Sequence, residues 1–267
     1  MLYRGRTALV TGGSSGIGLE FARALAERGA DLILVARSEG RLREAATGLG
    51  AAYGVRVETL AADLSESGSI ARISGAVAEL GREVGVLVNN AGSGHYGRFA
   101  EGPGPDEVWE GVSLNVASIA ALTRAFLPDM IRRGDGAVVN LSSTAAFQPV
   151  PYMATYGASK AFMLSFSEAL WAECQGTGVR VLAVCPGAVE TEFWADWGNK
   201  DPRRYNYLTG ISSPRQVAEA GLSALDSDKG LIVPGLRDRL LARFISFAPR
   251  SFVARASERM NHLKRGL

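Results

Sequence analysis

The sequence predicts an α/β protein built on a doubly wound parallel sheet of seven strands, with helices on both faces. Short β-branched, apolar segments alternate with helical patterns along the chain. The strand segments are continuous apolar runs, which is typical of parallel strands buried on both faces. A glycine-rich turn joins the first strand directly to the first helix, as expected for the first crossover of such a sheet.

Each expected strand is short and precedes a longer segment with helical periodicity. The strands are expected at residues 7–11, 31–36, 55–61, 86–89, 137–142, 179–184 and 230–233. Helices are expected between them, for example at residues 19–28, 39–53, 70–81, 109–132 and 155–175. Right-handed crossovers produce a doubly wound sheet from this order. Ligands bind such sheets at the carboxyl ends of the strands, so functional residues are expected just after each strand.

The composition indicates one domain with a substantial core. The chain has 267 residues, 47% hydrophobic and 21% charged, and no linker or repeat divides it. No apolar run reaches the ~18–20 residues that span a bilayer, and the N-terminus lacks the apolar stretch of a secretory signal. Cys174 and Cys185 are expected to be buried free thiols. These features predict a cytoplasmic protein.

The last 32 residues (236–267) form a basic extension beyond the α/β domain expected at residues 1–235. They contain eight basic and two acidic residues, so they carry +6 and the remaining chain −4 of a net +2. An apolar stripe at helical spacing predicts one helix, and a second is expected after Pro249; the stripe is Leu236, Leu240, Leu241, Phe244 and Ile245. We favour a helical flap or an oligomer contact; the alternative is a weak membrane-surface or lipid-substrate element.

The glycine-rich turn predicts a nucleotide site. Glycine lets the backbone turn sharply and approach a phosphate, and the following helix offers free N–H groups to a pyrophosphate. Its spacing, Gly-x-x-x-Gly-x-Gly, differs from the Gly-x-Gly-x-x-Gly of the standard dinucleotide turn. The expected cofactor contacts in this turn are Gly12, Ser14, Ser15, Gly16, Ile17 and Gly18.

The end of the second strand predicts the choice of cofactor. An acidic residue about 20 positions after the glycines usually binds the ribose 2′-hydroxyl of NAD. Here no acid is present, and Arg37 offers a guanidinium suited to a 2′-phosphate. The sequence therefore predicts NADP(H), with an ordinary solvated loop arginine as the alternative.

Polar residues also follow the third and fourth expected strands. Asp63, with Leu64 after it, can accept a hydrogen bond from an adenine amino group or can cap a helix. Asn90, Ala91 and Gly92 form a turn expected to hold the cofactor loop, although asparagine there can be purely a turn residue.

Tyr156 and Lys160 are the expected centre of the chemistry. Four residues apart on a helix, they lie on one face one turn apart. A cation beside a phenol favours the phenolate and is expected to lower the tyrosine pKa, which makes a usable proton donor and acceptor. Ser143, thirteen residues before the tyrosine, follows the fifth expected strand.

Taken together, these residues resemble the short-chain dehydrogenase/reductase family, whose fold is of the Rossmann type. The matching elements are Thr-Gly-x-x-x-Gly-Ile-Gly at 11–18, Asp63, Asn-Asn-Ala-Gly at 89–92, Asn115, Ser143, Tyr156, Lys160 and Pro186-Gly187 with Thr191. The resemblance implies that Tyr156 exchanges the proton, and that Lys160 lowers its pKa and holds the nicotinamide ribose. It also implies that Ser143 polarises the carbonyl.

The resemblance implies further roles. Asn115 is expected to kink its helix and hold a water of a proton relay, and the loop with Pro186, Gly187, Val189 and Thr191 to contact the nicotinamide and phosphate. One departure is the lack of a basic residue inside the glycine turn, which leaves Arg37 to carry the NADP(H) preference.

Aromatic residues crowd the segments that should form the substrate pocket. They suggest a fairly large apolar ketone or aldehyde, although packing or oligomer contacts explain them equally well. His95 is expected to be a loop or wall residue rather than a base. The segment carries His95, Tyr96, Phe147, Pro149, Pro151, Tyr152, Phe193, Trp194, Trp197, Tyr205 and Tyr207.

The sequence thus predicts an NADPH-dependent reductase of an apolar carbonyl compound. The alternatives are an NADP-dependent alcohol dehydrogenase working oxidatively and a catalytically silent nucleotide-binding regulator. The short basic tail and the lack of a recognisable reading module give no support for nucleic-acid binding. The resemblance implies a homodimer or homotetramer formed through helices at 104–132 and 155–176.

Overall fold

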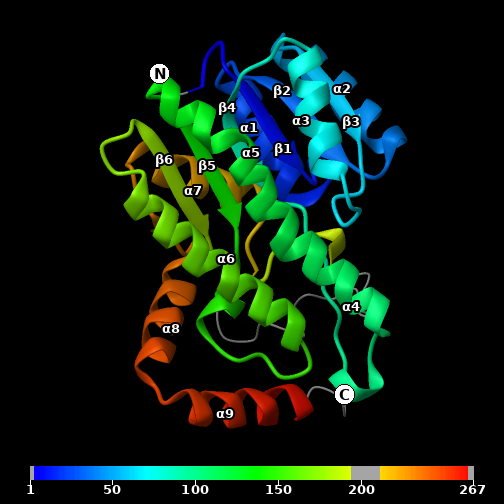
Figure 1. Ribbon diagram of the computed structural model, residues 1–267. Helices are drawn as coiled ribbons and strands as arrows, with labels where there is room; N and C mark the ends of the chain where they lie inside the picture. The colour runs from blue at the N-terminus through cyan, green and yellow to red at the C-terminus, as the bar shows by residue number, and fades with distance from the viewer. Residues whose placement is uncertain (1–2, 194–210, 264–267) are drawn as a thin grey trace.

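A computed structural model describes residues 3–193 and 211–263, with side chains described up to Arg259. Its centre is a seven-stranded sheet of order β3-β2-β1-β4-β5-β6-β7 (Figure 1). All six strand pairs are parallel. The strands are β1 (Thr7–Thr11), β2 (Asp31–Ala36), β3 (Val57–Ala61), β4 (Val84–Asn89), β5 (Gly136–Leu141), β6 (Val179–Val184) and β7 (Leu231–Ile232). The expected doubly wound sheet is confirmed.

The strand order reverses between β1 and β4, which both lie at the middle of the sheet. This switch point places the ends of β1, β4, β5 and β6 beside one another, where a ligand can bind. The main helices around the sheet are α1 (Gly16–Glu27), α2 (Glu39–Tyr53), α3 (Ser69–Glu79), α4 (Pro105–Val112), α5 (Ser118–Arg133), α6 (Ala154–Glu173) and α7 (Pro214–Asp226).

The expected helix at 109–132 differs from the structure. It is divided by a π-helical turn, η2 (Ser113–Ala117), and begins earlier, at Pro105 of α4. Apolar periodicity does not reveal such a turn, because the flanking segments keep their own 3.6-residue pattern. Two short 3-10 turns, η1 (Phe99–Glu101) and η3 (Thr144–Phe147), were also not expected.

The continuous helical stretch Pro105–Arg133 is long and apolar enough to cross a membrane by length and composition alone. The sequence analysis expected no such run. The inner side of α5 packs against β4 and β5, where Leu122, Phe126 and Met130 are buried. Burial of this inner side accounts for part of the hydropathy of the stretch, since only 28% of its most apolar window is buried.

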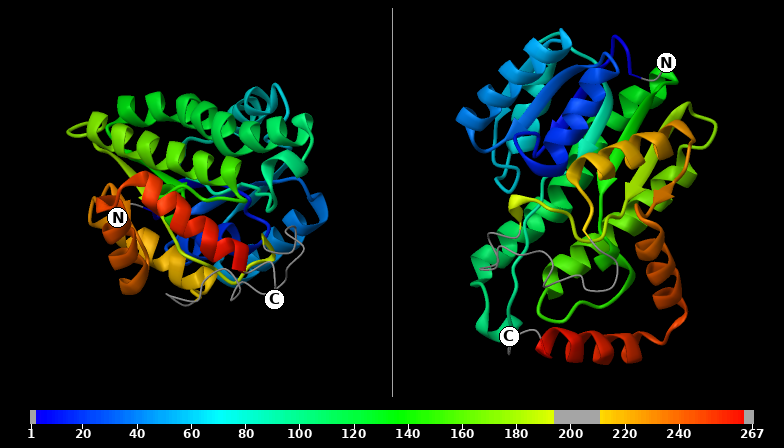
Figure 2. Two further views of the ribbon diagram at one scale, coloured as in Figure 1. Left: turned by 90° about the horizontal axis from the view of Figure 1, so that it is seen from below. Right: turned by 180° about the vertical axis from the view of Figure 1, so that it is seen from behind.

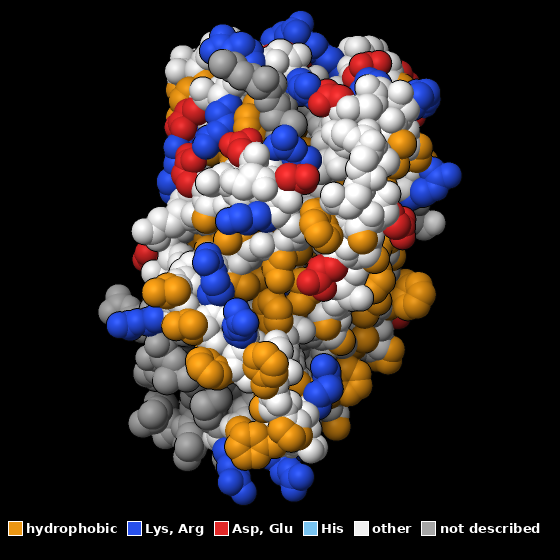
Figure 3. All heavy atoms as spheres, turned by 90° about the vertical axis from the view of Figure 1, so that its left-hand side faces the viewer, with side chains coloured by type: hydrophobic (Ala, Val, Ile, Leu, Met, Phe, Trp, Pro, Cys, Tyr) orange, Lys and Arg blue, Asp and Glu red, His pale blue; other side chains and the backbone are white. Residues whose placement is uncertain are grey.

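Two helices, α8 (Leu236–Phe247) and α9 (Arg250–Leu263), follow β7, as the sequence predicts. In Figure 1, α8 descends along one side of the molecule and α9 crosses below the carboxyl ends of the strands; Figure 2 shows the same crossing from below. The Tyr152 hydroxyl donates to Glu258 Oε1 of α9 at 3.0 Å. Figure 3 looks onto the side formed by α8.

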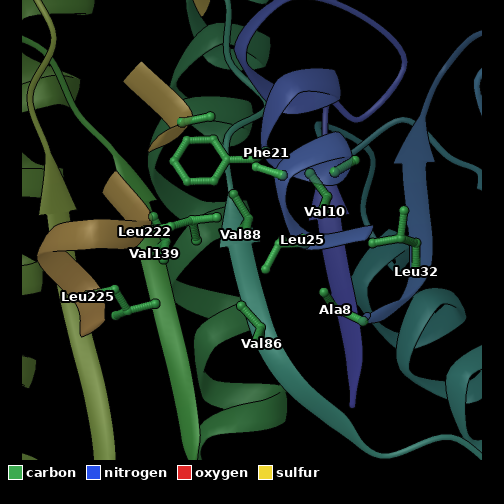
Figure 4. Close-up of a cluster of buried hydrophobic side chains, with 14 of the residues drawn as sticks. Ala8, Val10, Phe21, Leu25, Leu32, Val86, Val88, Val139, Leu222 and Leu225 are labelled. Atoms are coloured by element: carbon green, nitrogen blue, oxygen red, sulfur yellow. The ribbon is translucent and has the colours of Figure 1, made fainter. Parts of the chain in front are cut away.

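Two apolar layers fix the helices on the sheet. On one face Phe21 and Leu25 of α1 and Leu222 and Leu225 of α7 pack against β1, β4 and β5 (Figure 4). On the other, side chains of α3, α5 and α6 pack against the alternate residues of the same strands. Because each strand is covered on both sides, its residues are apolar at nearly every position.

Candidate active site

The glycine-rich turn is fastened to β4 by hydrogen bonds. The Asn90 amide Nδ2 donates to the carbonyl oxygens of Thr11 at 3.0 Å and Gly12 at 3.3 Å. The Thr11 hydroxyl accepts from the backbone N–H groups of Asn90 at 2.9 Å and Ala91 at 3.1 Å. Asn90 therefore acts on the turn itself. From the sequence Thr11 was expected only as part of a motif, without this role.

The glycines of the turn leave an open cradle of backbone at the start of α1. Gly12 and Gly16 have φ values of +63° and +54°, which L side chains rarely adopt. A Cβ atom at Gly12 would lie 2.6 Å from Asn90 Nδ2, and one at Gly18 would overlap the Gly12 carbonyl oxygen. Only glycine fits here, and the free N–H groups at the helix start fit a pyrophosphate.

A cavity of about 810 Å³ opens beside this turn. Ser14, Ser15, Gly16 and Thr191 line it, and so does Arg41 of α2. The Arg41 guanidinium pairs with Glu192 at 2.6 Å. Arg41 was not expected at this site; it lies four residues after Arg37, in the first turn of α2.

Arg37 is exposed at the end of β2, in the position expected for a 2′-phosphate contact. Asp63 accepts hydrogen bonds from the Ser65 N–H at 2.8 Å and hydroxyl at 2.6 Å. Burial opposes ionisation of Asp63, but these bonds and the charge of Arg37 outweigh it, so its pKa lies below the usual value. The carboxylate is thus ionised and holds the turn at Ser65, and Leu64 is buried. It does not cap a helix, because α3 begins after Gly68.

Tyr156, Lys160 and Ser143 come together where β5 ends and α6 begins. The Lys160 ammonium lies 5.6 Å from the centre of the Tyr156 ring and donates to the Leu141 carbonyl oxygen at 2.7 Å. Ser143 and Tyr156 share a side-chain hydrogen bond. Ser142 points elsewhere and donates to the Lys160 carbonyl oxygen at 2.8 Å, as the alternation of strand side chains requires.

The expectation that Lys160 lowers the tyrosine pKa is wrong for this structure. Burial raises the pKa of Tyr156 to about 12, and the Ser143 hydrogen bond only partly offsets this. Burial also lowers the pKa of Lys160 to about 8. Both groups lose water, and desolvation disfavours both charged forms. The phenol therefore keeps its proton well above neutral pH.

Asn115 lies in the π-helical turn and is 3% exposed. Its Oδ1 accepts from the Ser93 N–H at 3.0 Å, and its Nδ2 donates to the Ser93 carbonyl oxygen at 2.8 Å. A Cβ atom at Gly92 would lie 2.9 Å from Asn115 Oδ1 and 3.7 Å from Lys160 Nζ. Asn115, Gly92 and Lys160 are thus immediate neighbours, and the expected irregularity of the Asn115 helix is present.

A buried network of side-chain hydrogen bonds joins the elements that carry the site. Asn89 Nδ2 donates to Thr123 Oγ1 at 3.1 Å and to Asn140 Oδ1 at 2.8 Å. Asn140 Nδ2 donates to Ser167 Oγ at 2.9 Å. The network therefore ties α5 and α6 to β4 and β5. From the sequence Asn89 was expected only as part of a motif, and the other three residues were missed, because they look like isolated polar residues in apolar segments.

The loop after β6 contacts the other parts of the site. The Pro186 carbonyl oxygen accepts from the Thr144 N–H at 2.9 Å. A Cβ atom at Gly187 would lie 2.6 Å from a carboxylate oxygen of the buried Asp238 in α8. Val189 bridges to Ser212, and Thr191 lies against Gly16 of the glycine turn. The loop therefore spans from α8 to the nucleotide cradle, as expected for a cofactor loop; no sequence pattern marked Asp238.

Some of the expected pocket residues pack near the site, and others lie elsewhere. Phe193 packs against Tyr156, with ring centres 5.7 Å apart, and Tyr152 packs against Tyr96 at 6.1 Å. His95 is exposed, with its ring against Gly97 and Gly102 of its own loop. Phe147 packs instead on the small core cluster that includes Val233 and Ala242. Trp194, Trp197, Tyr205 and Tyr207 lie outside the described residues.

The nucleotide cradle and the Tyr156 cluster lie at one edge of the sheet, as in oxidoreductases that position a dinucleotide beside a proton donor. Residues 6–202 match the sequence pattern of the short chain dehydrogenases, and this chain belongs to that family.

Curated relatives are similar over most of the chain. A short chain dehydrogenase of Pseudocercospora fijiensis is 40% identical over 83% of this chain and 73% of its own length. The very-long-chain 3-oxoacyl-CoA reductase of Rattus norvegicus is 37% identical over 70% of this chain. The chain spans only 61% of that enzyme.

Solved structures agree in fold and sequence. A short-chain dehydrogenase from Sphingobium yanoikuyae in complex with NADPH is 33% identical, with a TM-score of 0.79 over 92% of this chain and 97% of the other. A 3-ketoacyl-(acyl-carrier-protein) reductase from Brucella melitensis complexed with NADH is 30% identical, with a TM-score of 0.76 over 88% of this chain and 99% of the other. The family therefore includes ketoreductases and binders of either nicotinamide cofactor.

Proposed function

We propose that this protein reduces the ketone or aldehyde group of an apolar small molecule with NADPH. The observation that carries the proposal is the half-buried Tyr156 phenol, which contacts Ser143 and lies beside Lys160. This cluster and the glycine cradle lie at the same edge of the sheet. When bound, the cofactor supplies hydride chemistry, and the protein supplies position and a proton.

Each residue of the cluster has a distinct role in this proposal. Tyr156 holds the proton that the carbonyl oxygen receives, because its phenol is protonated at neutral pH. The Ser143 hydroxyl orients and polarises the carbonyl as a hydrogen-bond donor. Lys160 places a positive charge behind the phenol and offers N–H groups to a ribose hydroxyl. Asn115 holds the Ser93 backbone in place beside Lys160. The same groups serve the reverse direction.

The preference for NADPH rests on the positive charge at the adenosine end of the site. Arg37 follows β2 where an NAD-specific enzyme carries an acid, and Arg41 lines the cavity with Ser14. The Sphingobium yanoikuyae relative that holds NADPH supports this choice. A relative that holds NADH shows that the preferred cofactor differs within the family. The preference for NADPH over NADH must therefore be tested in this chain.

The substrate proposal rests on the aromatic wall. Phe193 covers the ring of Tyr156, and Tyr96 and Tyr152 pack together nearby in the loops beyond the strand ends. Such a wall favours an apolar group beside the carbonyl. The rat relative acts, by its name, on very-long-chain 3-oxoacyl groups, which are carbonyl compounds of this apolar kind.

The direct experiment follows the loss of NADPH absorbance with a panel of aromatic and long-chain ketones and aldehydes. We expect turnover with apolar members and much less with small hydrophilic ones. If every member failed while NADPH bound normally, the chain would be a nucleotide-binding protein without this activity. A panel of matching alcohols with NADP⁺ covers the oxidative direction.

We also propose a homodimer through the outer side of α4–α5 and α6. Only 28% of the most apolar window of Pro105–Arg133 is buried, and Trp109 is 73% exposed. Phe162 and Phe166 of α6 stack with ring centres 5.5 Å apart, and Phe162 is partly exposed. Apolar patches of this kind are typical of protein interfaces.

A further inference from the structure

The outward face of α8 is apolar. Leu236, Leu240, Phe244 and Phe247 are 69%, 47%, 72% and 80% exposed. With 3.6 residues per turn they occupy one sector of about 80° on the helix. Asp238 and Ala242 lie on the opposite side and are buried against the body. The helix is thus packed by its less apolar side, and the flap interpretation does not account for the exposed stripe.

We name the exposed residues Leu236, Leu240, Phe244 and Phe247 the α8 stripe. Arginines border it on both edges: Arg237 on one side, and Arg239 and Arg243 on the other, at the angles that a helix of this pitch dictates. All three are exposed. Figure 3 shows apolar and basic side chains intermingled on the lower part of this side of the molecule.

Helix α9 continues the same pattern. Phe252 is 65% exposed, and Arg255 and Arg259 follow it one and two turns later on the same helix face. The two acidic residues of these helices lie toward the body of the protein. Asp238 is 6% exposed, and Glu258 accepts the hydrogen bond from Tyr152. The accessible surface of the described part of these helices therefore combines large apolar side chains with exposed arginines.

We propose that α8, assisted by the first turns of α9, binds the surface of an anionic lipid bilayer. The α8 stripe enters the boundary between headgroups and acyl chains, and the flanking arginines bind the headgroup phosphates and carboxylates. A second copy is a poorer occupant. A two-fold symmetric contact through the stripe would bring the arginines of one copy against those of the other. Charge complementarity therefore favours lipid.

The proposal is tested by sedimentation of the full chain with vesicles, without cofactor, so that the result is independent of the proposed activity. Vesicles of phosphatidylcholine with about one third phosphatidylserine are compared with phosphatidylcholine alone. We expect binding to the anionic vesicles, weakened by salt. Replacing Phe244 and Phe247 together by serine should lower the partition coefficient at least about tenfold. Leu80→Ser, which removes an exposed leucine at the end of α3, is the matched control and should bind as the wild type does.

A second pair of variants isolates the charge. Reversing Arg237 and Arg243 to glutamate should lower binding to anionic vesicles roughly tenfold or more. Arg43→Glu reverses an exposed arginine of α2 and should have no such effect. All variants must keep the wild-type unfolding transition.

Three results would overturn the proposal. The first is no binding of the wild type to either vesicle, and the second is binding that the α8 variants leave unchanged. The third is a dimer in solution that does not bind vesicles and that dissociates when Phe244 and Phe247 are both replaced by serine. That result would make the α8 stripe a contact between copies of this chain.

Discussion

Burial changes the pKa of both Tyr156 and Lys160. Burial raises the pKa of the phenol to about 12 and lowers that of the ammonium to about 8. Each shift disfavours the charged form, which is the phenolate for Tyr156 and the ammonium for Lys160. Folding therefore costs free energy at any pH where the unfolded chain carries that charged form. The neutral phenol is ready to donate a proton, and Ser143 fixes its direction.

The Lys160 shift predicts a pH-dependent stability. The pKa falls from 10.5 in the unfolded chain to about 8 in the folded one, so the unfolded chain binds more protons between these values. Wild-type stability should therefore decrease as the pH falls from about 10.5 to about 8, by about 3 kcal/mol from this group. Lys160→Met removes that loss. In urea unfolding, the free energy of unfolding of the variant should therefore rise relative to that of the wild type as the pH falls.

The control for this experiment is Lys229→Met, which removes an exposed lysine. Its stability relative to the wild type should change little over the same pH range. A Lys160→Met difference that stays constant from about pH 7.5 to about pH 10.5 would contradict the account of the buried ammonium.

Arg37 is the residue that decides the cofactor in the proposed function. Arg37→Asp replaces a guanidinium suited to a 2′-phosphate with a carboxylate suited to a ribose hydroxyl. The ratio of kcat/KM with NADPH to that with NADH should fall at least about tenfold. Arg43→Asp, at an exposed position of α2, should leave the ratio unchanged. An unchanged ratio in Arg37→Asp would refute the assignment.

At the scale of elements, α8 and the loop after β6 form one unit. Asp238 of α8 fills the space that a side chain at Gly187 would need. Gly187→Ala should therefore lower the free energy of unfolding by about 1–3 kcal/mol. In an Asp238→Ser background the same change should cost clearly less, because the smaller side chain leaves room. Equal costs in both backgrounds, measured by urea unfolding, would show that the contact is unimportant.

Elements with a strong local pattern could be predicted from the sequence, and those set by tertiary contacts could not. Four expected elements (7–11, 31–36, 39–53 and 179–184) match the structure to the residue. The π-helical turn around Asn115 and the short β7 depend on contacts that periodicity does not report. The same limit explains why Asn140 and Asp238 were missed: each owes its role to a partner far away in the chain.

At the scale of the whole molecule, the strand order brings the functional residues together. The glycine turn, Asn90, Ser143 and the loop after Pro186 follow β1, β4, β5 and β6, which are neighbours in the sheet. Their meeting could be predicted because the carboxyl ends of parallel strands share one edge. The direction of the Tyr156 pKa shift could not be predicted, because it depends on how completely the folded chain excludes water.

Tyr156→Phe, assayed with NADPH and an apolar carbonyl substrate, tests the central claim most directly. The variant lacks only the hydroxyl that contacts Ser143, and Tyr53→Phe, which removes an exposed hydroxyl bound to Glu27, is its matched control. We predict that Tyr156→Phe lowers kcat by at least about 10²–10⁴-fold while NADPH binding, followed by fluorescence, is unchanged. Reductase activity close to that of the wild type in Tyr156→Phe would contradict the account.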